Sequence, residues 1–189
     1  SSYRPFIAFA VIKGLSFSDE SLKSLMKLQE NLHWALGRNR KIASVGVYDL
    51  STISSEIYYT TIEPEDKGFV PLGSAVEMSP KDILEKHPKG INFAPLLNRM
   101  KNYPLLIDKK KGVLSMPPII NSENTRVTID STAVFIDVTG LIEASVNKAL
   151  NIVVTSIKEW NENATIHEVE IIQENGNTLY TPVLAPSQF

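Results

Sequence analysis

Two apolar segments of the sequence carry polar side chains where a buried strand normally gives way to an exposed turn. The segments are 114–121 (LSMPPIIN) and 135–140 (FIDVTG). Their polar members are Ser115, Asn121, Asp137 and Thr139. Side chains at strand ends can face a ligand, so these four residues are candidates for binding a substrate or orienting a reacting group.

Ser115 is open to two interpretations. It precedes a Pro-Pro pair that cannot continue regular strand pairing, so its hydroxyl could point into whatever the strand end faces. The alternative is a strand-end serine that hydrogen-bonds to the backbone.

Asp137 interrupts an apolar strand, where a carboxyl must be paired, hydrogen-bonded or on an open face. Strand alternation puts Phe135, Asp137 and Thr139 on one side, so the two polar side chains could face the same space. The alternative is that Asp137 faces solvent on a half-exposed strand and Thr139-Gly140 begins a helix.

The usual devices of a hydrolase are missing from the sequence. It has no cysteine, which excludes disulfides, thiolate catalysis and cysteine-ligated zinc. Its three histidines, His33, His87 and His167, lack the spacing of metal ligands, and we expect them to be structural or solvated. No GxGxxG, Walker loop or HExxH pattern occurs, so no cofactor and no metal are predicted.

Charge gives little indication of a nucleic-acid partner. Nineteen basic and 21 acidic residues give a formal net charge of −2. Basic residues gather at 38–41 (RNRK) and 109–111 (KKK). Either group could contact phosphates, but a solvated helix end or loop is the more usual explanation for such groups.

Length and composition predict one domain with a sizeable core, since 43% of the 189 residues are hydrophobic and 21% are charged. No apolar run approaches the roughly 18 residues that span a bilayer, so no membrane association is expected. The lack of cysteine fits a reducing compartment, which predicts the cytoplasm. A start without Met predicts a piece of a longer protein.

Apolar periodicity predicts an α+β fold with a sheet-rich core and helices packed on the outside. Helices are predicted after Ser18 as far as Gly37, over 79–87 and over 141–160. Strands are predicted at 6–13, 42–50, 56–63, 105–107, 112–116, 125–129, 133–138, 166–172 and 178–184. We expect 6–13 to be central, 42–50 to form a hairpin with 56–63, and 166–172 to form one with 178–184.

Several short segments, in order, resemble the editing domain of the β subunit of archaeal and eukaryotic phenylalanyl-tRNA synthetase. They are 4–5 (RP), 28–33 (LQENLH), 46–50 (GVYDL), 69–73 (FVPLG), 87–90 (HPKG), 103–106 (YPLL), 115–121 (SMPPIIN) and 135–140 (FIDVTG). The last two are the most specific, and the final predicted hairpin matches least. Tyr48 is a departure, because relatives commonly have His there.

The resemblance implies a β-sandwich-like sheet and a single tRNA-editing domain over residues 1–189 of a longer β chain. Its editing residues fall on Leu106, Ser115, Asp137 and Thr139, with Leu105 an alternative to Leu106. Asn121 is assigned with Leu106 to substrate binding. The implied partners are the tRNA(Phe) acceptor end carrying an esterified tyrosine, the synthetase α subunit and the rest of the β chain, in an α2β2 enzyme.

The implied activity is hydrolysis of tyrosine wrongly esterified to tRNA(Phe). In our mechanistic hypothesis, Leu106 helps to shape the slot for the aromatic ring. Ser115, Asp137 and Thr139 hold the amino group, the ester carbonyl or the attacking water. The alternative is a noncatalytic module that docks tRNA or packs against another subunit.

Overall fold

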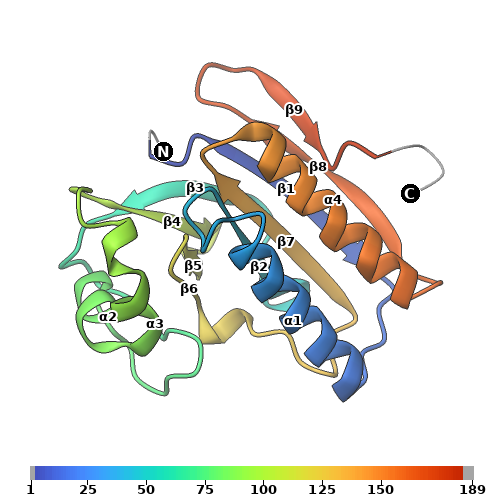
Figure 1. Ribbon diagram of the computed structural model, residues 1–189, viewed down its shortest axis with the longest axis horizontal. Helices are drawn as coiled ribbons and strands as arrows, with labels where there is room; N and C mark the ends of the chain where they lie inside the picture. The colour runs from blue at the N-terminus through green and yellow to red at the C-terminus, as the bar shows by residue number, and fades with distance from the viewer. Residues whose placement is uncertain (1–2, 185–189) are drawn as a thin grey trace. The chain divides into compact units, whose positions relative to one another are not determined.

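The computed structural model describes residues 3–184, and these contain four α-helices and two antiparallel sheets (Figure 1). The helices are α1 (Asp19–Trp34), α2 (Pro80–Lys86), α3 (Pro88–Phe93) and α4 (Glu143–Trp160). One sheet has the order β2 (Ala43–Asp49), β7 (Ala133–Gly140), β1 (Phe6–Lys13), β8 (Thr165–Ile172) and β9 (Thr178–Thr181). The other has the order β3 (Ile57–Ile62), β4 (Tyr103–Asp108), β5 (Val113–Met116) and β6 (Ile120–Asn121). The predicted α+β class is confirmed.

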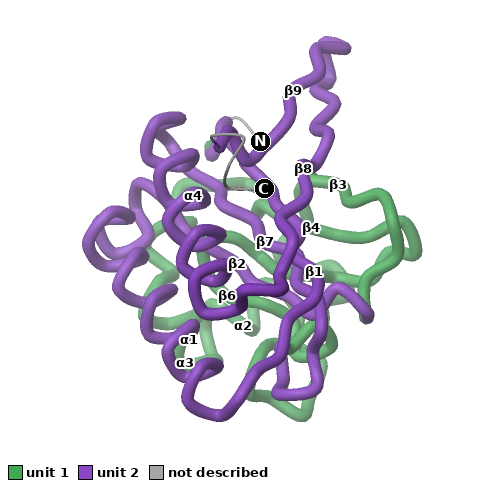
Figure 2. Tube along the Cα trace, turned by 90° about the vertical axis from the view of Figure 1, so that its right-hand side faces the viewer, with its two compact units in different colours: residues 1–3, 52–126 green, residues 4–51, 127–189 purple. Residues whose placement is uncertain are grey.

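The described chain divides into two compact units, each built on one of the sheets (Figure 2). Unit 1 comprises Tyr3 and Thr52–Arg126, and contains the four-stranded sheet with α2 and α3. Unit 2 comprises Arg4–Ser51 and residues 127–184, and contains the five-stranded sheet with α1 and α4. Each unit therefore combines segments that are distant in the sequence.

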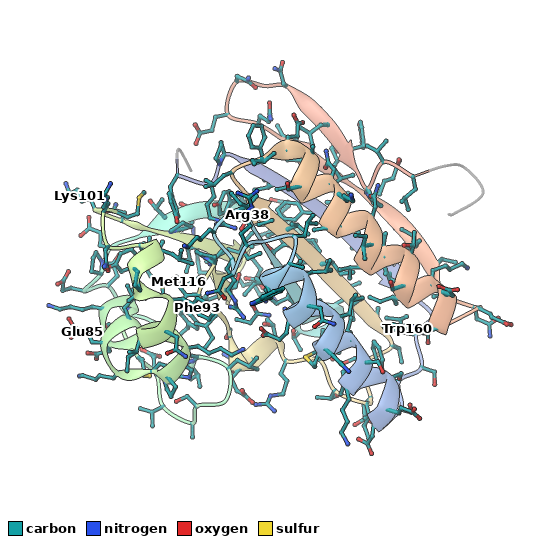
Figure 3. All side chains as sticks on the ribbon, in the orientation of Figure 1. Arg38, Glu85, Phe93, Lys101, Met116 and Trp160 are labelled. Atoms are coloured by element: carbon teal, nitrogen blue, oxygen red, sulfur yellow. The ribbon has the colours of Figure 1, made fainter. Side chains whose placement is uncertain are left out.

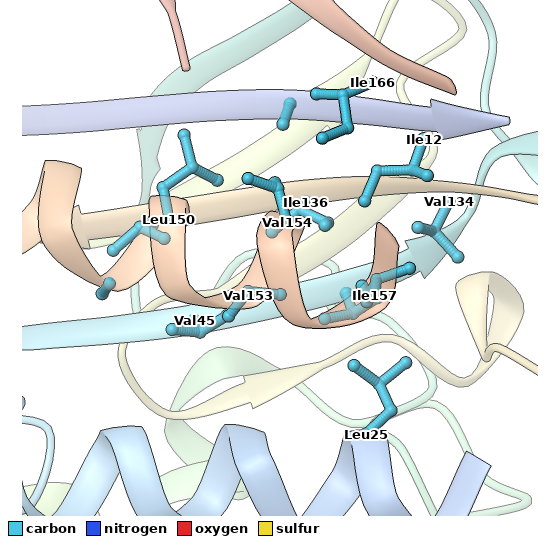
Figure 4. Packing of buried hydrophobic residues seen from close by; sticks show 14 of the residues in the cluster. Ile12, Leu25, Val45, Val134, Ile136, Leu150, Val153, Val154, Ile157 and Ile166 are labelled. Carbon is cyan, nitrogen blue, oxygen red and sulfur yellow. The ribbon is translucent and has the colours of Figure 1, made fainter. Parts of the chain in front are cut away.

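The core of unit 2 lies between the five-stranded sheet and its two helices. β1 is the central strand, as its continuous apolar sequence predicts. Helix α4 presents apolar side chains three and four residues apart to β1 and β7 (Figure 4). These are Leu150, Val153, Val154 and Ile157, and they belong to the same buried cluster as Ile12 and Ile136.

Helix α1 begins and ends near the predicted positions. Ser18 caps its first turn by accepting a hydrogen bond from the Ser21 amide, and the Ser21 hydroxyl oxygen accepts one from the Ser18 amide. The helix stops at Trp34, and a turn then leads into β2. Three consecutive residues of that turn, at 38–40, have positive φ. Arg38, the first of them, is labelled in Figure 3.

The core of unit 1 lies on one face of the four-stranded sheet. Its buried members include Ile83 of α2 and Met116 of β5, with Phe93 packed against them (Figure 3). Leu105 also belongs to this cluster. Helix α2 forms within the predicted range, and Ser79 caps it by accepting a hydrogen bond from the Asp82 amide.

Two predicted elements are wrong. β2 pairs with β7 and β3 pairs with β4, so the predicted hairpin between 42–50 and 56–63 does not form. The predicted strand at 125–129 begins at the last residue of a 3₁₀ helix (Glu123–Thr125), and the rest of it pairs with no strand among the described residues. The sequence also left α3 and β6 unpredicted, whereas the hairpin of β8 and β9 is confirmed. In residues 3–184, no helix combines the length and apolarity needed to cross a membrane.

Candidate functional site

Three of the predicted site residues lie side by side in unit 1. Leu106 of β4 pairs with Ser115 of β5, and Ser115 pairs with Asn121 of β6. Directly paired residues of antiparallel strands point to the same face of a sheet, so this register makes a row across three strands. We call Leu106, Ser115 and Asn121 the cross-strand row.

The cross-strand row lies on the face opposite the core of unit 1. Leu105, Met116 and Ile120 alternate with the row and belong to the core cluster. Leu106 is therefore the neighbour of Ser115, and Leu105 is a core residue of the other face. Ser115 is 2% exposed, Leu106 is buried and Asn121 is half-buried.

Asp137 lies at the middle of β7 in unit 2, between Phe9 of β1 and Gly46 of β2. It is only 2% exposed, so the solvent-facing alternative is wrong. The hydroxyl of Tyr48 donates a hydrogen bond to Asp137 Oδ1. Burial raises the pKa of Asp137 to about 7, although the Tyr48 hydrogen bond and the charge of Arg4 both lower it.

Thr139 is buried in a polar cluster organised by Arg4, and both residues have no exposed surface. The Arg4 guanidinium donates to Thr139 Oγ1 at 3.1 Å and to the Thr139 carbonyl oxygen at 2.6 Å. It also donates to Ser44 Oγ at 3.2 Å and to the Arg40 carbonyl oxygen at 3.1 Å. Thr139 Oγ1 also lies 3.3 Å from Ser44 Oγ. Thr139 is thus hydrogen-bonded to a buried cation. Strand β7 continues through Thr139 to Gly140, and α4 begins only at Glu143, so Thr139 does not begin the helix.

Arg4 and Tyr48 are functional candidates that the sequence reasoning did not assign. Arg4 stood in a segment that carried the family resemblance, but a single arginine before an apolar strand gives no signal that it will be buried. Tyr48 departs from the family pattern, which commonly has His at this position. The sequence did contain one signal for the role of Tyr48. It lies two residues after Gly46 on a predicted strand, and alternation places both residues on one face of the sheet.

The histidines have structural surroundings. His33 is buried, and its Nε2 lies 2.9 Å from the Val45 amide nitrogen. Burial is the main cause that lowers the pKa of His33, which favours the neutral ring. His87 caps α3, and His167 is exposed and bonded to Thr165. Within the described part of the chain, no three His, Cys, Asp or Glu side chains are grouped to hold a metal ion.

The two basic groups are exposed for the most part. Lys109 pairs with Glu56 at 2.7 Å, and Asp108 accepts hydrogen bonds from the Lys110 and Gly112 amides in the same turn. This geometry fits a solvated turn between β4 and β5. In the other group, Arg40 is buried and pairs with Glu30 at 3.0 Å.

The chemistry available therefore differs between the two units. Unit 1 offers a hydroxyl and an amide beside an apolar side chain, which can bind a ring and orient a polar group. Unit 2 offers a carboxyl whose pKa lies near neutrality, which can accept or share a proton at physiological pH.

Comparison with known proteins identifies relatives over nearly the whole chain. It is 49% identical to the phenylalanine–tRNA ligase β subunit of Methanosarcina barkeri over 97% of its length, and 45% identical to that of Methanocaldococcus jannaschii over 94%. It spans 33% and 32% of those two subunits, respectively. No family model matches the chain.

A solved structure has the same fold. It is the crystal structure of an N-terminal fragment of the phenylalanyl-tRNA synthetase β subunit from Pyrococcus horikoshii, with a TM-score of 0.92 and 40% identity. The match covers 98% of this chain and 52% of that fragment. These matches confirm the resemblance found in the sequence: the chain belongs to the family of phenylalanine–tRNA ligase β subunits, of which it spans about a third.

Proposed function

We propose that this chain is the amino-acid editing part of a phenylalanine–tRNA ligase, and that it hydrolyses the ester of tyrosine mischarged onto tRNA(Phe). The cross-strand row is the observation that carries the proposal. Leu106, Ser115 and Asn121 were selected as site residues from the sequence, and their strands bring them into adjacent positions on one face. The relatives support the proposal because they are β subunits of phenylalanine–tRNA ligases.

Editing of this kind solves a physical problem of substrate selection. Tyrosine differs from phenylalanine by one hydroxyl, and an apolar pocket rejects an added hydroxyl by only about a hundredfold. A site that requires the hydroxyl can reject the analogue lacking it by about 10⁴ or more. A second site that accepts only the tyrosyl ester is therefore the more selective filter.

The reaction needs one water molecule and no resident cofactor. The water oxygen bonds to the carbonyl carbon of the tyrosyl ester, and the bond from that carbon to the ribose oxygen breaks. One water proton ends on the ribose oxygen, so the products are free tyrosine and uncharged tRNA(Phe). The protein has to orient the water and stabilise negative charge on the carbonyl oxygen as it develops.

The residues of the cross-strand row are suited to holding the substrate. Leu106 supplies apolar surface for the aromatic ring, and Asn121 supplies an amide that can donate and accept. Ser115 supplies a hydroxyl that can donate to the ester carbonyl oxygen or to the attacking water.

Asp137 and Thr139 are the catalytic candidates of unit 2. In its ionised form, Asp137 accepts a hydrogen bond from the attacking water or from the substrate amino group. Thr139 accepts a hydrogen bond from Arg4, so its own hydroxyl proton can be donated either to Ser44 Oγ, 3.3 Å away, or to the substrate. The neighbouring Arg4 charge lowers the pKa of Asp137 and so favours the ionised form.

Single-turnover deacylation of Tyr-tRNA(Phe) by the whole enzyme tests the proposal. Asp137→Asn should slow the reaction by about a hundredfold or more, because it removes the charge that orients water or substrate. Asp130→Asn is the matched control, since Asp130 is an exposed carboxyl of the same unit. Unchanged deacylation by a folded Asp137→Asn enzyme contradicts the site assignment.

The cluster around Arg4 favours a second candidate, a noncatalytic module that docks tRNA or packs against another subunit. The hydrogen bond from Arg4 to Thr139 Oγ1 and the contact between the Thr139 and Ser44 hydroxyls give Thr139 a sufficient structural reason to be polar. On this alternative, Thr139→Val weakens tRNA affinity or subunit assembly and leaves the rate of deacylation per bound Tyr-tRNA(Phe) unchanged.

The proposed partners follow from the family. They are the acceptor end of tRNA(Phe), the synthetase α subunit and the remainder of the β chain, and the proposed location is the cytoplasm. Copurification of the full-length β chain with the α subunit, and its binding of tRNA(Phe), test the first two.

A further inference from the structure

Tyr48 and Asp137 face each other across two paired strands. Gly46 of β2 is directly opposite Asp137 of β7, and Tyr48 is opposite Phe135. Residues two apart on a strand share a face, so all four lie on one face of the sheet. From its position, the Tyr48 phenol extends diagonally past Gly46, and its hydroxyl donates to Asp137 Oδ1.

Gly46 leaves open the space that the contact between Tyr48 and Asp137 occupies. A Cβ atom there would collide with Asp137 Oδ1 and with the Tyr48 hydroxyl oxygen. The backbone at Gly46 is not in the left-handed region that favours glycine, so conformation does not explain the residue. A side chain of any size would separate the phenol from the carboxyl.

The Tyr48 ring is fixed by aromatic neighbours. It stacks on Phe135, with ring centroids 6.0 Å apart and an interplanar angle of 29°. Phe135 in turn contacts Phe9, at 5.3 Å and 42°. Tyr48 has no exposed surface, and its hydroxyl points toward Asp137.

The environment of Asp137 contains opposing influences on its ionisation. Burial disfavours the carboxylate, whereas the Tyr48 hydroxyl from β2 and the Arg4 guanidinium, which precedes β1, both favour it. Phe9, the β1 residue opposite Asp137, is not titratable. Tyr48 therefore affects both the direction of the carboxyl and the pH at which it loses its proton.

We propose that Tyr48 is a positioning residue for Asp137, and that Gly46 provides the space this contact needs. The hydrogen bond from the Tyr48 phenol to Asp137 Oδ1 restricts rotation of the carboxyl group. The other carboxyl oxygen, Oδ2, is therefore held in a fixed direction. In the editing reaction, this fixed and ionised carboxylate aligns the water or the substrate amino group. The structural part of the inference stands alone, and its catalytic part rests on the proposed function.

The structural part is tested by the pKa of Asp137 in the 189-residue chain, measured from the ¹³C resonance of its carboxyl carbon across a pH series. Tyr48→Phe keeps the ring and removes the donor, so the pKa of Asp137 should rise. Tyr180→Phe is the matched control, because Tyr180 donates to Glu170 at 3.2 Å but is exposed. An Asp137 pKa that is the same in wild type and Tyr48→Phe overturns the inference.

Gly46→Ala tests the space requirement in the same titration. It should raise the pKa of Asp137 in the same direction as Tyr48→Phe, because the added methyl separates the two groups. The double variant should show little further rise, since both changes remove one contact. Two independent, additive rises would contradict the role given to Gly46.

The catalytic part is tested by the pH profile of Tyr-tRNA(Phe) deacylation by the whole enzyme. With Tyr48→Phe, the rate at neutral pH should fall about tenfold to a hundredfold and should recover partly at higher pH, where Asp137 ionises without the phenol. A loss that is equal at every pH overturns the positioning role. A wild-type enzyme that does not deacylate Tyr-tRNA(Phe) contradicts the proposed function, while the carboxyl titration still decides the contact between Tyr48 and Asp137.

Discussion

Ser115 in the four-stranded sheet and Thr139 in the five-stranded sheet are both buried hydroxyl residues, but their surroundings differ. Ser115 lies in a cross-strand row with Leu106 and Asn121, where its neighbours are an apolar chain and an amide. Thr139 is held by the Arg4 guanidinium, on a strand that also carries Asp137. The unit 1 residues are thus placed by strand register, and the unit 2 residues by a network of buried charge.

This difference indicates how each region will respond to substitution. A row made by strand pairing keeps its geometry when one side chain changes, since the backbone hydrogen bonds remain. A buried polar network loses several interactions at once when its central donor is removed. We therefore expect substitutions in the cross-strand row of unit 1 to lower activity with little loss of stability. In unit 2, we expect substitutions in the Arg4 network to lower both.

Replacement of Arg4 should give the largest effect on stability. Arg4→Met leaves the Thr139 carbonyl, the Arg40 carbonyl and two hydroxyls without a charged donor in a buried position. We expect a loss of about 3 kcal/mol or more in the free energy of unfolding, measured by urea denaturation. Arg126→Met, at an exposed pair with Glu123, is the control and should change little. Similar losses in the two variants would remove the contrast between the units.

Asp137 should make stability depend on pH in a direction unusual for an aspartate. Its folded pKa of about 7 lies above the ordinary aspartate value of 3.8, so between these two pH values the folded state holds a proton that the unfolded state has lost. The stability that Asp137 contributes by holding this proton is fully present below the unfolded pKa. It is lost as the pH rises toward and through the folded pKa. The free energy of unfolding should fall by at most about 1.4 kcal/mol per pH unit in that window.

Asp137→Asn removes this dependence. Urea denaturation of both proteins between the two pKa values should give a steeper decline for wild type than for the variant. The variant should therefore gain stability relative to wild type as the pH rises. Parallel profiles would mean that Asp137 is ionised throughout, with Tyr48 and Arg4 outweighing its burial.

Removal of the Thr139 hydroxyl should have an intermediate effect. Thr139→Val keeps the branched shape, but Arg4 loses one acceptor and Ser44 one hydrogen-bond partner. We expect a loss of about 1–2 kcal/mol in the free energy of unfolding. In a double-mutant cycle, Thr139→Val should cost less in an Arg4→Met background, whereas equal losses in both backgrounds would indicate no coupling.

Local sequence patterns predicted the elements whose signals are local. The Ser18 cap and the spacing of apolar residues gave α1, and alternation placed Phe135, Asp137 and Thr139 on one face of β7. The predicted hairpin of 42–50 with 56–63 failed because β2 pairs with β7, a strand distant in the sequence. Partner choice between distant strands depends on the assembled core, which no short segment encodes.

The candidate site was predictable to a similar extent. Strand ends and family motifs selected Leu106, Ser115 and Asn121, but only the register shows them to be neighbours. Arg4 was not found because its four acceptors come from β7, β2 and the turn after α1, and half of them are backbone oxygens. Every residue has a backbone carbonyl oxygen, so the sequence does not show which of them will accept a hydrogen bond from Arg4.

Ser115→Ala should have the smallest effect on stability. The substitution retains strand pairing with Leu106 and Asn121, so the free energy of unfolding should fall by about 1 kcal/mol or less. The exposed Ser55→Ala in the same unit is the matched control. If Ser115 orients the ester, deacylation of Tyr-tRNA(Phe) should nevertheless fall about tenfold or more. A large loss of stability with an unchanged deacylation rate would assign Ser115 a structural role and would make unit 1 resemble unit 2.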